Sequence, residues 1–309
     1  MQPIRLALVG YGKIAQDQHV PAILANPAFD FRAVATLGQP CPGVENFSTL
    51  RTLLEAQPAV DAVAFCTPPQ GRYAQVREAL LAGKHVLVEK PPCATLGEAM
   101  ALAELAKQQS VSCLFAWHSR YAPGVQVARQ WLEGKQLQSV AVSWKEDVRK
   151  WHPGQQWIWQ PGGLGVFDPG INALSIITHI LPEPLFVNGA DLCFPANRQA
   201  PIAASLRITS ACGLAVSAEL DWDHHHHDEL WRIEVQCAEG LLRLDHGGAS
   251  LSVDGEPLVV PEEGEYPALY RHFAELLQAG RSDTDLQPLR LVADSFFAGS
   301  RRLVEPFND

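Results

Sequence analysis

Apolar runs alternate with amphipathic stretches over the first 117 residues of the chain. The runs are continuously apolar, as parallel strands buried on both faces require, and the stretches between them place apolar residues at helical spacing. Such alternation predicts an α/β fold with a doubly wound parallel sheet and right-handed crossovers. The expected strands are Ile4–Val9, Phe31–Thr36, Ala62–Thr67, His85–Glu89 and Ser112–Trp117, and the expected helices are Leu50–Ala56, Arg72–Ala82 and Leu96–Gln108.

The pattern changes near His118. After a predicted helix at Val125–Leu132, short turns rather than helices separate the apolar segments, which favours an antiparallel sheet. We therefore predict two domains, 1–117 and 118–309. The length agrees with this, because 309 residues are more than one hydrophobic core usually supports. The later strands are expected at Ser139–Glu146, Leu185–Leu192, Ser205–Thr209, Leu214–Asp221, Trp231–Gln236 and Leu241–Leu244, and the later helices at Pro169–Ile180, Pro267–Gln278 and Leu289–Leu303.

The composition excludes several classes of protein. Hydrophobic residues make up 47% of the chain and charged residues 19%, which is usual for a globular protein. The net charge of −10 argues against a nucleic-acid-binding surface, which needs a basic face. The apolar runs are shorter than the roughly 20 residues that span a bilayer, and Ile4–Val9 resembles a first strand rather than a signal peptide.

Neither the cysteines nor the histidines predict a metal site. The seven cysteines are odd in number and widely spaced, without a C-x-x-C pair, so we expect reduced thiols and a cytoplasmic protein. Consecutive histidines in a turn cannot all converge on one ion. We therefore interpret His224–His227 as a solvated loop and expect no metal.

A glycine-rich turn follows the first predicted strand. Gly10-Tyr11-Gly12-Lys13-Ile14-Ala15 has the pattern G-x-G-x-x-A. The first glycine permits a tight turn and the second lets the backbone approach a pyrophosphate at the start of the following helix. Its place after the first of several alternating strands predicts a dinucleotide site, whereas a purely structural turn is the alternative.

The segment 36–39 follows the second predicted strand, where such folds bind the adenosine ribose. It holds no Asp or Glu for the ribose hydroxyls and no Arg for a 2′-phosphate. We therefore expect NAD as the cofactor. NADP stays an alternative, because no carboxylate repels its extra phosphate.

Ligands of such sheets bind at the carboxyl ends of the strands. Two of these ends are Thr67-Pro68 and Glu89-Lys90-Pro91. A lysine held beside a proline can donate to a sugar hydroxyl or act as a base. From the residues alone, a solvent-exposed lysine without a role is an equal alternative for Lys90.

Several stretches together resemble the Gfo/Idh/MocA oxidoreductase family. They are the glycine turn, Thr67-Pro68, the AGKHVLVEKP stretch at 82–91, and 162–168. The stretches at 117–120, 144–149, 151–155 and 167–172 further resemble its aldose 1-dehydrogenase branch. The resemblance implies a Rossmann domain followed by an α+β domain with an open-faced antiparallel sheet. It also implies oxidation of the C1 hydroxyl of D-galactose, and of L-arabinose, to the lactone with NAD(P).

The motifs and the resemblance together predict the site residues. Many family members carry a His where this chain has Arg72, and an Asp-x-x-x-His where it has Asp168 and Asn172, which favours the aldose branch. The expected cofactor contacts are Gly10, Gly12, Lys13, Ile14, Thr36, Thr67, Pro68, Glu89 and Lys90. The expected substrate contacts are Lys90, His118, Glu146, Trp151, His152, Asp168 and Asn172.

The expected reaction is hydride transfer from C1 to the nicotinamide, with Lys90 as the base and Asp168 as the alternative base. Asp168-Pro169 also has the pattern of an ordinary helix start. Asn172 lies one turn beyond Asp168 on the same helix face, so both side chains can hold sugar hydroxyls. For Trp144 and Trp159 we expect a packed seam between the domains rather than a sugar contact.

Two other functions fit this fold: a sensor that binds sugar and dinucleotide without reacting them, and a dehydrogenase of another polyol. A sensor would be expected to lose the lysine after the fourth strand, and Lys90 is present. We also expect outward-facing apolar residues on the C-terminal sheet, and therefore a homo-oligomer formed through that sheet.

Overall fold

The computed structural model describes residues 2–225 and 228–308. The chain divides into two compact units. Unit 1 comprises Met1–His118 and Gly264–Leu286, and unit 2 comprises Ser119–Glu263 and Gln287–Asp309. The predicted boundary at 117/118 lies at the end of the first segment of unit 1, and the second segment of this unit was not predicted from the sequence.

Unit 1 contains a six-stranded sheet in the order β3-β2-β1-β4-β5-β6, with all neighbouring strands parallel. The order reverses between β1 and β4, which is where ligands bind in doubly wound sheets. The α/β class is therefore confirmed, and only the short edge strand β3 was not predicted. The strands are β1 (Ile4–Val9), β2 (Phe29–Ala35), β3 (Glu45–Phe47), β4 (Ala62–Phe65), β5 (His85–Glu89) and β6 (Cys113–Ala116).

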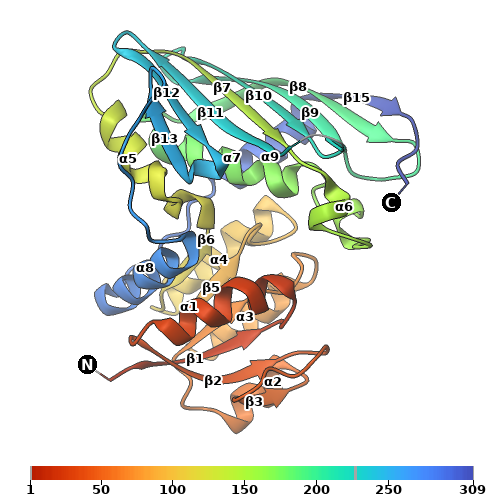
Figure 1. Ribbon diagram of the computed structural model, residues 1–309. Helices are drawn as coiled ribbons and strands as arrows, with labels where there is room; N and C mark the ends of the chain where they lie inside the picture. The colour runs from red at the N-terminus through yellow and green to blue at the C-terminus, as the bar shows by residue number, and fades with distance from the viewer. Residues whose placement is uncertain (1, 226–227, 309) are drawn as a thin grey trace. The chain divides into compact units, whose positions relative to one another are not determined.

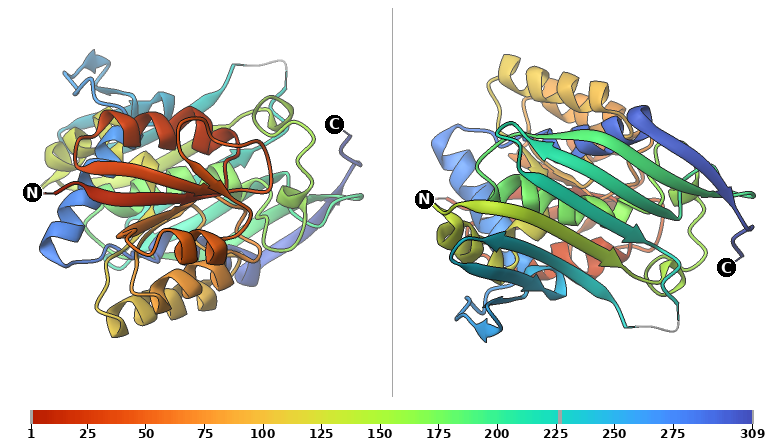
Figure 2. Two further views of the ribbon diagram at one scale, coloured as in Figure 1. Left: turned by 90° about the horizontal axis from the view of Figure 1, so that it is seen from below. Right: turned by 90° about the horizontal axis from the view of Figure 1, so that it is seen from above.

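The helices of unit 1 cover both faces of this sheet. Helix α1 packs against α8, whereas α3 packs against α2 and α4 (Figure 2, left view). Local chemistry sets their starts: Thr95 and Glu98 form a reciprocal capping box at α4, and the Thr49 hydroxyl accepts from the Thr52 amide at α2. The helices are η1 (Ala15–His19, a π-helix), α1 (Val20–Ala25), α2 (Leu50–Ala56), α3 (Arg72–Leu81), α4 (Leu96–Gln108) and α8 (Glu265–Ala279).

Unit 2 contains a nine-stranded sheet in the order β14-β13-β12-β11-β7-β10-β9-β8-β15. The sheet is mixed, because β7 pairs with β10 in parallel, as β15 does with β8. The predicted antiparallel sheet therefore also contains two parallel pairs, whose strands are far apart in the chain. The strands are β7 (Leu137–Lys145), β8 (Leu185–Pro195), β9 (Ala203–Ser210), β10 (Ala215–Asp221), β11 (Leu230–Cys237), β12 (Gly240–Asp245), β13 (Ser250–Val253), β14 (Glu256–Pro257) and β15 (Gly299–Val304).

Helices α5, α7 and α9 lie on one face of this sheet (Figure 1) and leave the other face open (Figure 2, right view). Inward positions such as Val140 and Val142 are buried, and outward neighbours such as Ala141 and Ser217 are exposed. The expected apolar outward face was therefore wrong, because these positions carry mostly small, polar or charged residues. The remaining helices are η2 (His118–Tyr121), α5 (Pro123–Leu132), α6 (Val148–Trp151), η3 (Trp157–Trp159), α7 (Phe167–Ile180), η4 (His246–Gly248) and α9 (Gln287–Ala298).

The predicted helix Leu289–Leu303 was also wrong in where it ends. Helix α9 ends at Ala298, and Gly299–Val304 forms β15 at the edge of the sheet. A side chain at Gly299 would bring its Cβ within 2.4 Å of the Ser295 carbonyl oxygen and 3.2 Å of the Ala190 Cβ. Pairing with β8, which is distant in sequence, therefore decides this segment. Within the described residues, no helix combines the length and apolarity needed to cross a bilayer.

Candidate active site

The glycine turn lies directly after β1 and beside the end of β4. Gly10 has φ +92°, and a Cβ there would lie 2.8 Å from Thr67 Cγ2 and 2.9 Å from the Thr67 amide nitrogen. A Cβ built on Gly12 would meet no described atom within 4 Å. The first glycine is therefore required by packing and backbone conformation, whereas the second leaves open space beside the backbone, as a dinucleotide site needs.

The helix after the turn carries two of the predicted cofactor residues. Helical backbone runs from residue 13 to residue 25. Lys13 is exposed and forms an ion pair with Asp17, and Ile14 is exposed as well. Lys13 is thus a cation at the surface of the first helical turn, where an anionic phosphate is favoured.

The end of β2 is uncharged in the structure as in the sequence. The hydroxyl of Thr36 accepts a hydrogen bond of 3.1 Å from the Gly38 amide, and the Leu37 side chain is 91% exposed. This turn offers a hydroxyl and backbone groups to a ribose and no ionic group to select between the two nicotinamide cofactors.

Glu89, at the end of β5, is buried with its carboxylate turned into unit 1. Its Oε2 accepts from the Lys90 amide at 2.6 Å, and its Oε1 accepts from the Tyr266 hydroxyl at 2.7 Å. His19 Nε2 lies 3.2 Å from the same Oε1. The carboxylate thus holds the backbone of the neighbouring residue Lys90.

Burial and pairing act against each other in this network. Burial lowers the pKa of His19, but contacts with Cys66 and Glu89 raise it to about 9. Burial raises the pKa of Glu89, but the hydrogen bond and charge of His19 lower it to about 2. The network therefore holds an imidazolium and a carboxylate as a buried ion pair at neutral pH.

His118 belongs to unit 1. Its Nδ1 lies 2.5 Å from Glu265 Oε2, and its ring stacks on Tyr266 at a centroid distance of 5.2 Å. Burial lowers its pKa, but the Glu265 carboxylate raises it above its ordinary value overall. His118 is therefore oriented by residues of α8, which is distant in sequence.

In unit 2, Asp168 and His152 form a pair. Asp168 lies in the first turn of α7, where it is 2% exposed, and its Oδ2 is 3.4 Å from His152 Nε2. Helix α7 begins at Phe167 with Val166 as its N-cap, so the alternative of Asp168 as the N-cap was wrong. The side chain is instead available to pair with the imidazole.

Asn172 lies one turn after Asp168, as the sequence predicted. It is partly exposed, and its carbonyl oxygen accepts from the Ser175 hydroxyl at 2.7 Å. Its side-chain amide makes no hydrogen bond to any described residue. A side-chain amide can both donate and accept hydrogen bonds.

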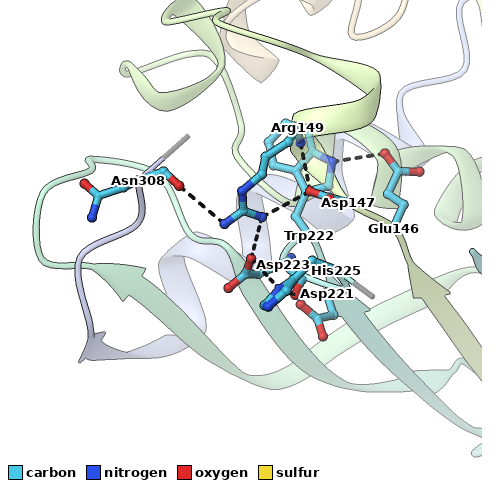
Figure 3. A network of polar contacts seen from close by, with 8 residues as sticks. All are labelled: Glu146, Asp147, Arg149, Asp221, Trp222, Asp223, His225 and Asn308. Atoms are coloured by element: carbon cyan, nitrogen blue, oxygen red, sulfur yellow. Dashed lines mark hydrogen bonds and ion pairs between the residues drawn. The ribbon is translucent and has the colours of Figure 1, made fainter. Parts of the chain in front are cut away.

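Glu146 is buried between two indoles. Trp222 Nε1 donates to its Oε1 at 3.0 Å, and Trp231 Nε1 donates to its Oε2 at 2.8 Å. Figure 3 shows the first of these bonds beside a polar cluster in which Arg149 binds Asp147, Asp223 and the Asn308 carbonyl oxygen. Both oxygens of Glu146 are thus oriented by tryptophans from other parts of unit 2.

The aromatic residues of this region fall into two groups. Trp151 is 38% exposed and lies 5.6 Å from Trp231 between ring centroids, so it presents an apolar surface to solvent. Trp144 and Trp159 are both 4% exposed, and they lie beside Trp231 and Trp222 of the same unit. An exposed indole beside polar groups is suited to pack on a sugar ring.

Packing explains the glycines after Trp159. A Cβ on Gly163 would lie 2.0 Å from the Trp157 carbonyl oxygen, and one on Gly165 would lie 2.3 Å from the Pro201 carbonyl oxygen. Close backbone packing within unit 2 thus requires both glycines. The turn need not approach a ligand to account for them.

The predicted histidine loop lies partly outside the described residues, because 226–227 are not included. In the described part, His225 Nδ1 lies 2.9 Å from the Asp223 carbonyl oxygen. No group of His, Cys, Asp and Glu able to hold a metal ion occurs among the residues that the structure describes.

Sequence reasoning missed four residues of these networks: His19, Tyr266, Trp222 and Trp231. The available indication for Trp222 was its place between Asp221 and Asp223 beside the histidine run, where a large apolar residue is unusual. Nothing local singles out His19 or Tyr266, because their partners are far away in the sequence.

Comparison with known proteins shows the family to which this chain belongs. The model of the Gfo/Idh/MocA family, described as an oxidoreductase family with an NAD-binding Rossmann fold, matches residues 4–116. The chain is 66% identical to a galactose 1-dehydrogenase of Pseudomonas fluorescens over 309 residues. The aligned region covers 100% of each chain. The chain belongs to the Gfo/Idh/MocA oxidoreductase family, as its sequence motifs predicted.

Solved structures resemble the whole chain. A crystal structure of D-galactose-1-dehydrogenase from Rhizobium etli matches with a TM-score of 0.96 and 53% identity, covering 100% of this chain and 99% of that one. A 3-ketoreductase from Actinomadura kijaniata in complex with NADP and TDP-benzene matches with a TM-score of 0.85 and 21% identity, over 98% and 99% of the two chains. The second match supports the fold alone.

Proposed function

We propose that this protein oxidises the C1 hydroxyl of D-galactose, and that of L-arabinose, to the aldonolactone with NAD(P)+. The observation that carries the proposal is the 66% identity to a galactose 1-dehydrogenase over the full length of both chains. D-Galactopyranose and L-arabinopyranose share their configuration from C1 to C4, so one set of contacts can serve both sugars.

The cofactor contacts proposed are the residues of the glycine turn and of the strand ends in unit 1. Gly12 leaves room beside the backbone, and Lys13 supplies a nearby cation. When bound, the nicotinamide accepts the hydride that leaves C1 of the sugar. We propose NAD as the preferred form, because the turn at 36–39 carries no basic group for a 2′-phosphate. A higher kcat/KM with NADP than with NAD would contradict this preference.

Lys90 is proposed as the base that removes the proton from the C1 hydroxyl, with Asp168 as the alternative. The Lys90 amide is held by the Glu89 carboxylate, so its side chain starts from a fixed point. Asn172 is proposed to hold sugar hydroxyls, since an amide donates and accepts but does not titrate in this range. His152, Glu146, Trp151 and His118 are proposed as further sugar contacts.

A substrate panel tests the proposed function. The purified protein is incubated with NAD or NADP and with D-galactose, L-arabinose, D-glucose or myo-inositol, while the absorbance of reduced nicotinamide is followed. We expect the largest kcat/KM with D-galactose or L-arabinose. Turnover of myo-inositol alone would favour the dehydrogenase of another polyol, and binding of sugar without any turnover would favour the sensor.

We further propose a cytoplasmic homo-oligomer assembled through the sheet of unit 2. All seven cysteines are free thiols, which suits a reducing compartment. Part of the open face carries short side chains, at Ser139 and Ala141 of β7 beside Ala215 and Ser217 of β10, so another sheet can approach it closely there. A monomeric mass in light scattering at micromolar concentration would contradict the oligomer.

A further inference from the structure

Arg72 is a buried arginine beside the predicted base. It is the first residue of α3, follows Gly71 with φ +78°, and is only 3% exposed. A charged side chain is almost never buried so fully unless its donors are satisfied. Its hydrogen-bond partners therefore indicate what it does.

The guanidinium of Arg72 binds three backbone carbonyls at two strand ends. Its Nη1 donates to the carbonyl oxygen of Glu89 and, at 2.5 Å, to that of Pro91. Its Nη2 donates to the carbonyl oxygen of Thr67. Glu89 and Pro91 are the two residues that flank Lys90, and Thr67 follows β4. One planar side chain thus ties the Lys90 segment to the neighbouring strand end.

The Lys90 segment is held from another direction as well. The Glu89 carboxylate accepts from the Lys90 amide at 2.6 Å, and Tyr266 fixes that carboxylate at 2.7 Å. The backbone groups on both sides of Lys90 are therefore bound by buried, charged side chains. A lysine side chain has four rotatable bonds, so the protein controls its amine chiefly by fixing the point from which the side chain starts.

We propose that Arg72 is a positioning residue for the sugar dehydrogenase reaction, which sets the place of the Lys90 amine by fixing the carbonyls on either side of it. The planar guanidinium presents several donors in a fixed fork. An imidazole, with two nitrogens, could not bind three carbonyls, and a lysine ammonium is a compact point charge without this planar geometry. The inference rests on the proposed function in one respect: Lys90 must act on the substrate.

The test is a double-mutant cycle between Arg72→Lys and Lys90→Ala. We measure kcat, the KM for D-galactose, the KM for NAD+ and the melting temperature of each variant. Arg72→Lys keeps the charge but loses the planar guanidinium. We expect kcat to fall about 10- to 100-fold, because the Lys90 amine is then misplaced. Because Arg72 acts through Lys90, the same substitution in the Lys90→Ala background should change the residual kcat less than about twofold.

Arg290→Lys is the matched control. Arg290 is a partly buried arginine of α9 in unit 2, and it donates to the carbonyl oxygen of Leu185 at 3.1 Å. Replacing the Arg290 guanidinium changes packing at a position that is distant in sequence from Lys90. We expect its kcat to stay within about twofold of the wild type.

The outcomes separate this inference from the proposed function. If Arg72→Lys lowers kcat by the same factor with and without Lys90, or leaves it near the wild-type value, the inference is overturned. Arg72→Met is a second variant, and failure of both Arg72 variants to fold would assign the guanidinium to stability and overturn the inference too. An unchanged kcat in Lys90→Ala alone would refute the role of Lys90. A wild type inactive on every aldose would refute the proposed function.

Discussion

Tyr266 and Glu89 are 177 positions apart in the sequence, and the hydroxyl of Tyr266 donates a 2.7 Å hydrogen bond to Glu89 Oε1. Tyr266 lies on α8, in the segment that returns to unit 1. The same Glu89 carboxylate holds the Lys90 amide. A late part of the chain therefore completes the network that supports an early strand end.

This network makes stability depend on pH in both directions. The pKa of Glu89 is lowered from 4.5 to about 2, so its stabilisation is present above 4.5 and is lost as the pH falls towards 2. The pKa of His19 is raised from 6.5 to about 9, so its stabilisation is present below 6.5 and is lost as the pH rises through 9. Melting temperatures measured across pH should show a plateau between about 4.5 and 6.5; a steady rise up to pH 9 would contradict the His19 ion pair.

Removing one donor of the network should be measurable. Tyr266→Phe leaves the shape of the ring but withdraws the hydrogen bond to a buried carboxylate, which costs about 1.5–3 kcal/mol. The free energy of unfolding in urea measures this loss. Tyr73→Phe in the same unit is the control, because Tyr73 is partly exposed, and equal effects of the two variants would contradict the role of the Tyr266 hydroxyl.

The two glycines of the turn should respond differently to alanine. Gly10→Ala places a Cβ 2.8 Å from Thr67 Cγ2 at φ +92°, so it should lower the melting temperature. Gly12→Ala meets no described atom within 4 Å, so it should leave the melting temperature unchanged and raise the KM for NAD+. Thermal unfolding and cofactor titration distinguish them, and an unchanged KM in Gly12→Ala would argue against a dinucleotide at this position.

Glu146 should contribute to the free energy of unfolding even in the absence of sugar. Glu146→Leu leaves the indole N–H groups of Trp222 and Trp231 without their acceptor. Trp222 is fully buried, so its unsatisfied donor alone costs about 1–3 kcal/mol, whereas Trp231 is only partly buried. Urea unfolding measures the loss. The exposed carboxylate of Glu183, in the loop before β8, provides the control, Glu183→Leu, which should stay within about 0.5 kcal/mol.

Lys90→Ala and Asp168→Ala should each lower kcat about 100- to 10,000-fold, the usual contribution of a general base, while each variant stays folded. The exposed residue Lys107 of α4 is the control, as Lys107→Ala. Steady-state turnover at saturating D-galactose gives kcat. Near-normal turnover in either variant would remove that residue from the proposed catalytic set.

The sequence by itself determined most elements of unit 1 and the positions of its motifs. Continuous apolar runs and helical spacing are local properties, so β1, β5, α2 and α4 have the predicted bounds. The glycine turn was recognisable because only glycine tolerates the conformation of Gly10 beside Thr67. The family, too, followed from motifs that lie within short stretches of the chain.

The tertiary structure decided the features that depend on residues far apart in sequence. The carboxylates of Glu89 and Glu146, two of the predicted contact residues, accept hydrogen bonds from Tyr266 and from two tryptophans that the local sequence does not indicate. The segment 299–304 joins β8 as a strand despite its helical pattern. Local periodicity encodes which face of an element is apolar but not which distant partner it meets. Those partners determine how far the site side chains are buried, how they are charged and how the backbone at Lys90 is held.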